Sequence, residues 1–320
     1  MFGDNFLREG KVSFNIDTCQ WVMWSDRDDR NTFNHIHRAF LRALKYMGKE
    51  AYYLSNGDDL SKYDFSNTMF LSMNCVLEGL PQRDDCFYFI HNISNDPHES
   101  YFDGLNMMGY GVHVLSNKYS SAVQEIGPDV YFDASSRTMM MYWGTDLLPH
   151  EIEANKPLRV FNQESRICNY IGSVDGNKNK AIKDFSRACQ ENGIQYQGYG
   201  GYNNGRVVSI DEHIQLIKDS YMAPAFQGLD QVAQGYMSCR IFKNLSYGQM
   251  PLTHSAYANE LFGGKLIFNT DTYRLFFDAK ERLQSMSLKE LHNLMDEVAK
   301  KHTYLPKIEA IIKAVKILEG

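Results

Sequence analysis

Arg240 and Lys243 are the residues whose types and spacing point most directly to chemistry. They lie three positions apart in an amphipathic segment, so both side chains project from the same side of a helix. Both bind phosphate, and arginine does so with two parallel N–H groups. Gly248 ends the segment as a left-handed closing residue does, and Pro251 follows soon after. The pattern predicts a helix that binds a diphosphate; the alternative is a structural helix whose charges are solvated.

A second candidate phosphate site is the turn from Gly172 to Lys180, which follows a predicted strand at 166–171. Small residues after a strand let backbone N–H groups approach an anion, and the start of the next helix favours negative charge. Ser173 would offer such an N–H group, and Lys178 would add a cation. The alternative is a plain polar turn, because the segment has neither a GxGxxG nor a Walker pattern.

Two aspartates are candidate catalytic bases. Asp26 and Asp28 lie between a predicted first strand at 11–16 and a predicted first helix at 33–47. An open α/β sheet places ligands at that position. A carboxylate there would deprotonate an incoming hydroxyl group. The alternative is structural: Asp29 caps the helix, and neighbouring arginines pair with the acids.

His91 is a further candidate base, at the end of a strand predicted at 86–90. Its alternative is a half-buried histidine that is hydrogen-bonded in the core. The run from Asp26 to Asp28 also matches a D-x-D metal motif. A match of three residues is weak evidence, and the cysteines form no CxxC pair, so we expect no metal site.

Composition excludes several classes of function. The chain has 320 residues, 43% of them hydrophobic and 22% charged, and a net charge of -6 without a long basic run. We therefore expect no nucleic-acid partner. No segment has the roughly 20 apolar residues that span a bilayer, and the N-terminus lacks the apolar core of a signal peptide. Six dispersed cysteines indicate free thiols in a reducing, cytoplasmic compartment.

Strand-like and helical runs alternate along most of the chain, which predicts an α/β fold with two doubly wound, Rossmann-like domains. The expected domains are 1–155 and 156–320, joined by a helix-poor linker at 146–157 that contains two prolines. The strands expected in the first domain, besides 11–16 and 86–90, are 51–54, 68–73, 112–115 and 130–132.

The C-terminal tail is expected to be helical. Ser287 to Glu290 has the form of a capping box, and Pro306 is expected to break the pattern before a final helix. That helix carries lysines beside an apolar stripe. The stripe indicates either core packing back across both domains or weak association with a membrane surface.

The segment 240–248 resembles the R-x-F-E-x-x-x-x-G signature of the CgeB-like glycosyltransferases, relatives of the family-one group with the GT-B fold. The similarity continues through 251–253, 260–262 and the strand at 265–268. His302-Thr303-Tyr304 resembles the late H-T-Y element of that family. At the level of pattern, the resemblance covers roughly the last 160 residues, and its motifs are moderately specific.

The resemblance implies a metal-independent transferase that moves a sugar from a nucleotide-diphosphate sugar to a hydroxyl group of a glycan or glycoconjugate. The nucleotide sugar would be a co-substrate, with no other cofactor. It would bind in the C-terminal domain, and the acceptor would bind in the N-terminal domain. The expected donor-binding residues are Gly172, Ser173, Lys178, Arg240, Lys243, Asn244, Tyr247 and Gly248.

Lys243 departs from the family pattern, which has an acidic residue at this position that contacts the donor ribose. A lysine cannot accept a hydrogen bond from a hydroxyl group, although it can face a phosphate. Two alternatives therefore stand beside the transferase: a nucleotide-sugar or glycan-binding protein without catalytic activity, and a sugar-nucleotide epimerase of the same architecture.

Overall fold

The structure is a computed structural model that describes residues 14–27, 32–92, 102–112, 122–172, 174, 179–200 and 206–320. Three of the predicted site residues, Asp28, Ser173 and Lys178, lie outside the described residues.

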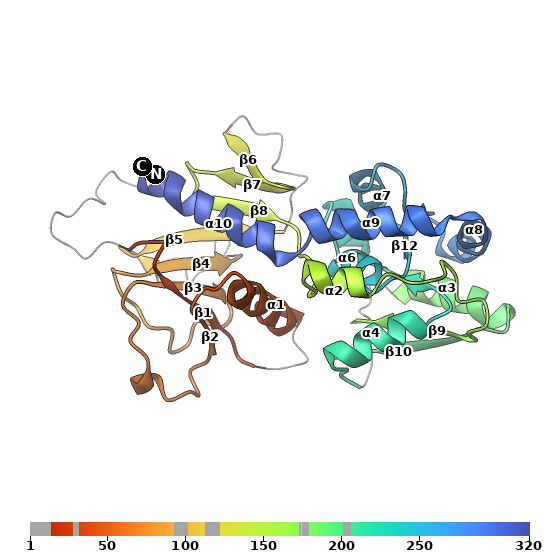
Figure 1. Cartoon of the computed structure of the whole chain (residues 1–320), viewed down its shortest axis with the longest axis horizontal. Coiled ribbons are helices and arrows are strands. Elements are labelled where there is room, and N and C mark those ends of the chain that lie inside the picture. The colour runs from red at the N-terminus through yellow and green to blue at the C-terminus, as the bar shows by residue number, and fades with distance from the viewer. Residues whose placement is uncertain are drawn as a thin grey trace.

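An eight-stranded sheet forms the N-terminal part of the molecule (Figure 1). Its strand order is β2-β1-β3-β4-β5-β8-β7-β6. The strands from β2 to β8 in this order pair in parallel, whereas β7 pairs antiparallel with both β8 and β6. The strands are β1 (Gln20–Trp24), β2 (Ala51–Leu54), β3 (Thr68–Met73), β4 (Phe87–His91), β5 (Asn106–Gly111), β6 (Val123–Gly127), β7 (Val130–Asp133) and β8 (Thr138–Met141).

The strand predicted at 11–16 is wrong where it can be checked, because residues 14–16 form a loop and the start of a turn. The first described strand is β1, whose residues after the first are all buried. A strand buried on both faces reads as a continuous apolar run and lacks the alternation that marks a half-exposed strand. The predicted strands at 51–54, 68–73, 86–90 and 130–132 are confirmed to within one residue at each end.

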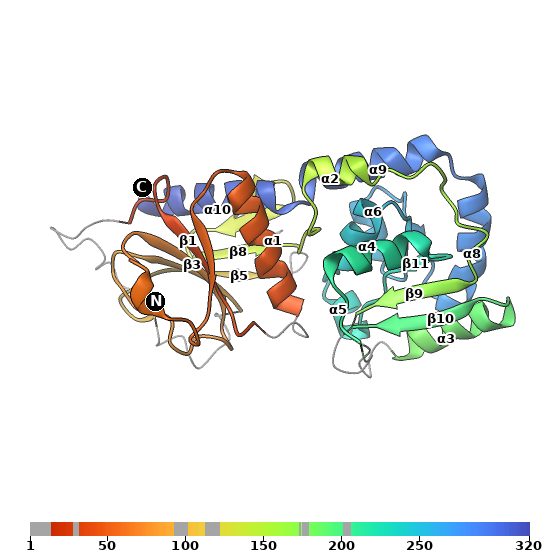
Figure 2. The same ribbon diagram turned by 60° about the horizontal axis from the view of Figure 1, so that its bottom comes forward.

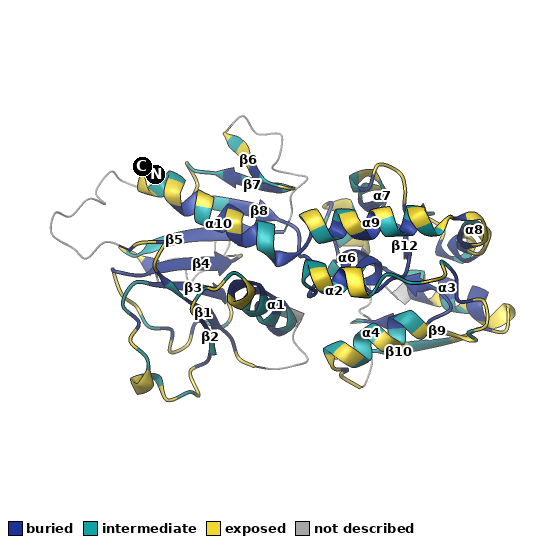
Figure 3. Cartoon of the chain, viewed as in Figure 1, coloured by how far each residue is buried: buried dark blue, intermediate teal, exposed yellow. Residues whose placement is uncertain are grey.

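The N-terminal sheet has helices on one face. The helices α1 (Thr32–Tyr46) and α10 (Tyr304–Glu319) lie beside it in both views (Figure 2), and their buried side chains join those of β1, β3 and β4 in one core. The opposite face is covered by connecting segments that include the short helix η1 (Leu60–Lys62). The central strands β3 and β4 are accordingly buried along their whole length, whereas β6 at the edge is partly exposed (Figure 3).

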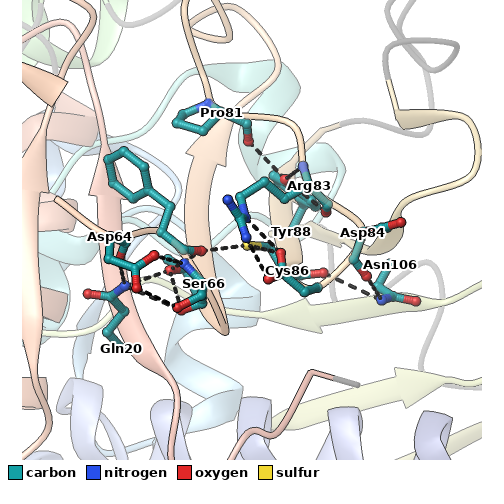
Figure 4. A network of polar contacts seen from close by, with 12 residues as sticks. Gln20, Asp64, Ser66, Pro81, Arg83, Asp84, Cys86, Tyr88 and Asn106 are labelled. Atoms are coloured by element: carbon teal, nitrogen blue, oxygen red, sulfur yellow. Dashed lines mark hydrogen bonds and ion pairs between the residues drawn. The ribbon is translucent and has the colours of Figure 1, made fainter. Parts of the chain in front are cut away.

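A polar network closes the sheet at the amino end of β4 (Figure 4). The Tyr88 hydroxyl donates to the Pro81 carbonyl (2.8 Å) and accepts from the Arg83 backbone N–H (2.7 Å). The Arg83 guanidinium forms an ion pair with Asp85 at 2.7 Å. These contacts join the loop at 81–85 to Tyr88 of β4.

A second set of parallel strands forms the C-terminal part, with β10 (Gln195–Tyr199) beside β9 (Ile167–Ile171), and β11 (Ala223–Pro224), β12 (Pro251–Thr253) and β13 (Ile267–Phe268) in sequence. Backbone contacts join the two groups, because Tyr221 N donates to Ile167 O at 2.7 Å. The helices around them are α3 (Asn179–Glu191), α4 (Ile210–Asp219), α5 (Leu229–Ala233), α6 (Cys239–Ser246), α7 (Ala256–Leu261), α8 (Thr272–Ser285) and α9 (Leu288–Lys301).

The linker between the two parts contains a helix, contrary to the expectation of a helix-poor segment. This helix, α2 (Pro149–Ala154), begins at its proline. Proline fits the first helical position because the N–H that it lacks would have no acceptor there. The Leu148 N–H donates to the Glu151 carboxylate at 2.8 Å, which stabilises the start of the helix.

The last helix crosses back to the N-terminal sheet, as predicted. Ile308, Ile311 and Val315 are buried in the core that α1 and the strands share, so the apolar stripe is occupied within the protein. Lys307 is buried as well, whereas Lys313 and Lys316 are exposed.

We expected Pro306 to precede this helix, but it lies in the first turn of the helix. The first N–H groups of a helix have no acceptor within the helix, so a proline there breaks no hydrogen bond.

Candidate functional site

The helix α6 ends as predicted. Tyr247 is its last partly helical residue, and Gly248 follows with a positive φ of 91°. A Cβ atom at Gly248 would lie 2.7 Å from the Asn155 carbonyl oxygen. The glycine therefore permits two things at once, the left-handed turn and close contact with the linker.

Arg240 lies in the first turn of α6, and its side chain reaches β9. The guanidinium carbon is 4.9 Å from the centre of the Tyr170 ring, and Nη1 donates to the Tyr170 hydroxyl (3.0 Å) and to the Phe226 carbonyl (3.4 Å). A Cβ atom at Gly172 would lie about 3.0 Å from the guanidinium carbon. Two candidates from distant parts of the sequence, Arg240 and Gly172, are thus in contact.

These residues lie at the carboxyl edge of the C-terminal sheet. Because β11 and β12 pair in parallel, the residues that follow them meet at the same edge. Arg240 connects that edge with the end of β9, since it contacts Gly172 and donates to the Phe226 carbonyl. The residues that follow the three strands include Gly172 after β9, Gln227 after β11 and His254 after β12. Figure 2 shows β9 and β10 directed toward the N-terminal part of the molecule. This edge therefore faces the other sheet.

Three side chains at this edge, the buried Gln227 and His254 and the half-buried Arg240, have buried polar atoms without a hydrogen-bond partner among the residues that the structure describes. They are Nε of Arg240, Oε1 of Gln227 and both ring nitrogens of His254. A buried polar group that is left unpaired costs about 1–3 kcal/mol. Because these groups lie together at one sheet edge, we take this edge as the candidate binding site.

Phe226 lies between Arg240 and the two residues His254 and Gln227. The His254 ring centre lies 5.5 Å from that of Phe226, whose carbonyl accepts from Arg240. Burial lowers the pKa of His254, although the Gln227 backbone raises it in part. Our sequence analysis did not predict either residue. Their position directly after short apolar segments could have indicated that they lie at strand ends.

Lys243 has a partner that the sequence pattern did not indicate. Its ammonium group lies 2.9 Å from the Asp146 carboxylate in the linker, and the Tyr247 hydroxyl donates to the same carboxylate at 2.7 Å. Burial by itself raises the pKa of Asp146, but Lys243 and other neighbours outweigh it and lower the pKa to about 2. The pair is therefore ionised, and both side chains are nearly inaccessible to solvent.

Asn244 and Tyr247 likewise hold α6 in place. The Asn244 amide donates to the Ala223 carbonyl of β11 at 3.0 Å, and Tyr247 is fully buried against the linker. Of the eight predicted donor-binding residues, Arg240 and Gly172 lie together at the sheet edge. Lys243, Asn244, Tyr247 and Gly248 lie where α6 packs against β11 and the linker.

The candidate bases come from the N-terminal sheet. Asp26 is exposed just after β1, and its carboxylate accepts a hydrogen bond from Asn34 at 2.7 Å. His91 ends β4 and is buried among the rings of Phe33, Tyr110 and Trp143, at centre distances of 4.9, 4.9 and 5.1 Å. The strand β3 separates the two candidates in the sheet.

Within the described ranges, no group of three or more histidine, cysteine, aspartate or glutamate side chains is arranged to hold a metal ion. Among the same residues, no helix has the length and apolar character needed to cross a membrane.

No protein-family model and no curated protein matches the chain. Among solved structures, it is similar to an α-glucosyltransferase in complex with UDP and a DNA 13-mer that contains an HMU base. The TM-score is 0.56 at 10% identity, over 95% of this chain and 100% of that one.

Two weaker similarities are to a DNA-modifying β-glucosyltransferase and to a UDP-forming trehalose-phosphate synthase from Burkholderia xenovorans. The first has a TM-score of 0.47 at 9% identity over 93% of this chain and 100% of that one. The second has a TM-score of 0.46 at 10% identity over 91% and 80%. From the strand topology and the α-glucosyltransferase similarity, the chain has the GT-B fold, with two Rossmann-like α/β parts.

Proposed function

We propose that this protein is a glycosyltransferase that moves a sugar from a nucleotide-diphosphate sugar to a hydroxyl acceptor. The observation that carries the proposal is the contact between Arg240 and Gly172 at the carboxyl edge of the C-terminal sheet. An arginine whose Nε has no hydrogen-bond partner among the described residues, and which lies beside a glycine, suits a diphosphate. The GT-B fold supports this assignment but does not by itself define the activity.

In the proposed reaction, the acceptor oxygen bonds to the anomeric carbon while the bond from that carbon to the β-phosphate oxygen breaks. The electron pair of the broken bond leaves with the nucleoside diphosphate, and Arg240 stabilises its added negative charge. A base takes the proton of the acceptor hydroxyl. Asp26, Asp28 and His91 stay the candidates for that base. The charge on Arg240 lets the proposed mechanism proceed without a metal ion.

The proposed acceptor is a glycan or glycoconjugate, and the proposed relationship is to the CgeB-like enzymes. The solved α-glucosyltransferase is a complex with a DNA that contains an HMU base, so hydroxymethylated DNA belongs in the acceptor panel. Incorporation of sugar into such DNA would replace the glycan proposal and our expectation of no nucleic-acid partner. It would leave the proposed donor site in place.

The donor site can be tested with a thermal-shift panel of UDP-, GDP-, dTDP- and CMP-sugars. We expect one of them to raise the melting temperature by mass action and to be slowly hydrolysed to the nucleoside diphosphate. An Arg240→Ala variant should lose at least about tenfold in affinity, since charge-assisted contacts contribute about 1.5–3 kcal/mol.

The matched control is Arg274→Ala, which removes an exposed arginine of α8 and should bind the donor normally. If no nucleotide sugar shifts the unmodified protein, the transferase proposal fails. Tight binding with no turnover on any acceptor would favour the non-catalytic alternative. The pairing of Lys243 with Asp146 gives this lysine a structural role, and the turnover measurement decides between the two alternatives.

A further inference from the structure

The carboxyl ends of β11 and β12 carry two buried side chains that the proposed reaction does not use. Gln227 is 1% exposed and His254 is 6% exposed. They are linked to Arg240 through Phe226, which joins Gln227 in sequence and contacts the His254 ring. They therefore belong to the same edge as the proposed diphosphate site, on the side of β12.

In the part of the chain that the structure describes, the free donors and acceptors of Gln227 and His254 indicate which chemical group of a ligand these residues can bind. The Gln227 amide nitrogen donates to the Tyr236 carbonyl at 2.7 Å, which fixes the amide. No donor among the described residues reaches its Oε1 atom. Among the described residues, neither ring nitrogen of His254 makes a hydrogen bond of ordinary geometry, although the Gln227 backbone lies close enough to the ring to raise its pKa. A neutral imidazole offers one donor and one acceptor.

A phosphate does not suit these two residues. Phosphate oxygens at neutral pH only accept hydrogen bonds, so they cannot satisfy Oε1 of Gln227 and would leave two acceptors facing each other. A hydroxyl group donates and accepts, and it can serve Gln227 and His254 together. The cationic Arg240 nearby is the group that suits the phosphates.

We propose that Gln227 and His254 bind a sugar hydroxyl group of the nucleotide sugar, next to the diphosphate held by Arg240. The inference rests on the proposed function and names the chemistry of one part of that site. Two sources of the hydroxyl fit, the transferred glycosyl unit and the ribose, and binding measurements separate them. A site built to hydrogen-bond a hydroxyl discriminates strongly against ligands that lack it, because its buried polar groups are then unpaired.

The experiment is calorimetric titration of the folded, full-length chain with UDP-glucose, UDP and pyrophosphate, or with the corresponding ligands of whichever nucleotide the donor panel identifies. The variant is His254→Phe, which keeps a ring against Phe226 but removes both nitrogens. We expect about a tenfold loss of UDP-glucose affinity, the scale of one hydrogen bond to a buried group, and no change for pyrophosphate. A loss for UDP-glucose alone identifies the glycosyl hydroxyl, and an equal loss for UDP identifies the ribose.

The matched control is His37→Phe. His37 is a fully buried histidine of α1 whose two nitrogens are also without partners in the described structure, and it should leave all three affinities unchanged. His254→Asn keeps a donor and an acceptor and should recover part of the loss. Circular dichroism checks that each variant is folded.

A second measurement needs no variant. Deoxy analogues of UDP-glucose and of UDP, each lacking one hydroxyl, are titrated against the unmodified protein, and one of them should bind about tenfold more weakly. His254→Phe should then bind that analogue and its parent with similar affinity, because the lost contact is the same.

The inference is overturned if His254→Phe binds UDP-glucose as the unmodified protein does, or if pyrophosphate affinity falls in parallel. It is also overturned if every deoxy analogue binds like its parent. These failures leave the transferase proposal standing. If the unmodified protein binds no nucleotide or nucleotide sugar at all, the proposed function and this inference fail together.

Discussion

At the scale of the residue, Lys243 shows that the surroundings of a side chain determine its role. In the sequence it is a departure from a pattern that has an acid at this position. In the structure its ammonium group is paired with Asp146 from the linker. Removing one partner of a buried pair typically costs about 3–5 kcal/mol, because the other charge stays buried without a counter-ion. Lys243 therefore contributes to the contact between α6 and the linker.

Lys307 is a buried cation whose ammonium group makes no hydrogen bond within the described structure. Burial lowers its pKa to about 8 from 10.5, although Asp129 partly opposes the shift. A shift of this size corresponds to about 3 kcal/mol of destabilisation at neutral pH, from about 1.4 kcal/mol per unit.

We predict that Lys307→Met raises the free energy of unfolding by about 2–3 kcal/mol at pH 7. The folded pKa lies below the unfolded one, so the unfolded chain binds more protons between pH 8 and 10.5. The stability of the unmodified protein therefore rises across that range, and its difference from the variant should shrink. Urea unfolding at pH 7, 8.5 and 10 measures this. Lys313→Met, at an exposed site of the same helix, is the control, and an equal effect of both variants would contradict the prediction.

At the scale of the element, α6 connects the proposed donor site with the linker. Arg240 in its first turn contacts β9, while Lys243 and Tyr247 hold Asp146, and Gly248 lies against Asn155. A shift of α6 thus moves both the arginine and the linker contacts. The glycine turn is the part of this arrangement that a single substitution tests most directly.

Gly248→Ala should destabilise the protein by about 2–3 kcal/mol, because alanine adds left-handed strain of about 1 kcal/mol to the crowding against the Asn155 carbonyl. Gly193, which follows α3, has φ +71°, and a Cβ atom added there would have no neighbour within 4 Å. Gly193→Ala should therefore show the strain alone, about 1 kcal/mol. Thermal unfolding of both variants measures the difference. Equal destabilisation would mean that the linker contact adds nothing.

At the scale of the whole molecule, the last helix belongs to the core of the first sheet. The chain leaves the N-terminal sheet after β8, builds the second set of strands, and returns through α10 (Figure 1). Tyr304 packs on Phe40 with ring centres 4.4 Å apart, and Ile308 and Ile311 are fully buried. The N-terminal core therefore includes side chains of α10.

We predict that residues 1–155 expressed alone do not fold cooperatively. The same fragment with residues 303–320 joined through a flexible linker should fold, because the helix covers apolar surface worth about 25 cal/mol per Å². Circular dichroism during thermal unfolding distinguishes the two fragments. Ile311→Asp in the joined fragment is the control that should remove the gain. A cooperative transition in the short fragment would show that α10 is dispensable for this core.

Local patterns in the sequence predicted the parts of the fold that depend on local forces. The helical period of α1, α3 and α9 and the glycine after α6 are such features, since helix periodicity and a left-handed stop act within a few residues. The approach of Arg240 to Gly172 could also be predicted in outline, because strand ends in a parallel sheet meet at one edge. Strand β1 was missed, since a strand buried on both faces shows no alternation.

By itself, the sequence determined the α/β rhythm, the helix that carries Arg240 and the glycine turns, because these follow from hydrophobic spacing and backbone conformation. Only the tertiary structure decided the partners. It paired Lys243 with Asp146, buried Lys307, and brought Gln227 and His254 to the edge beside Arg240. The reason is physical: burial and pairing depend on contacts between distant segments, and no local pattern specifies which segments meet.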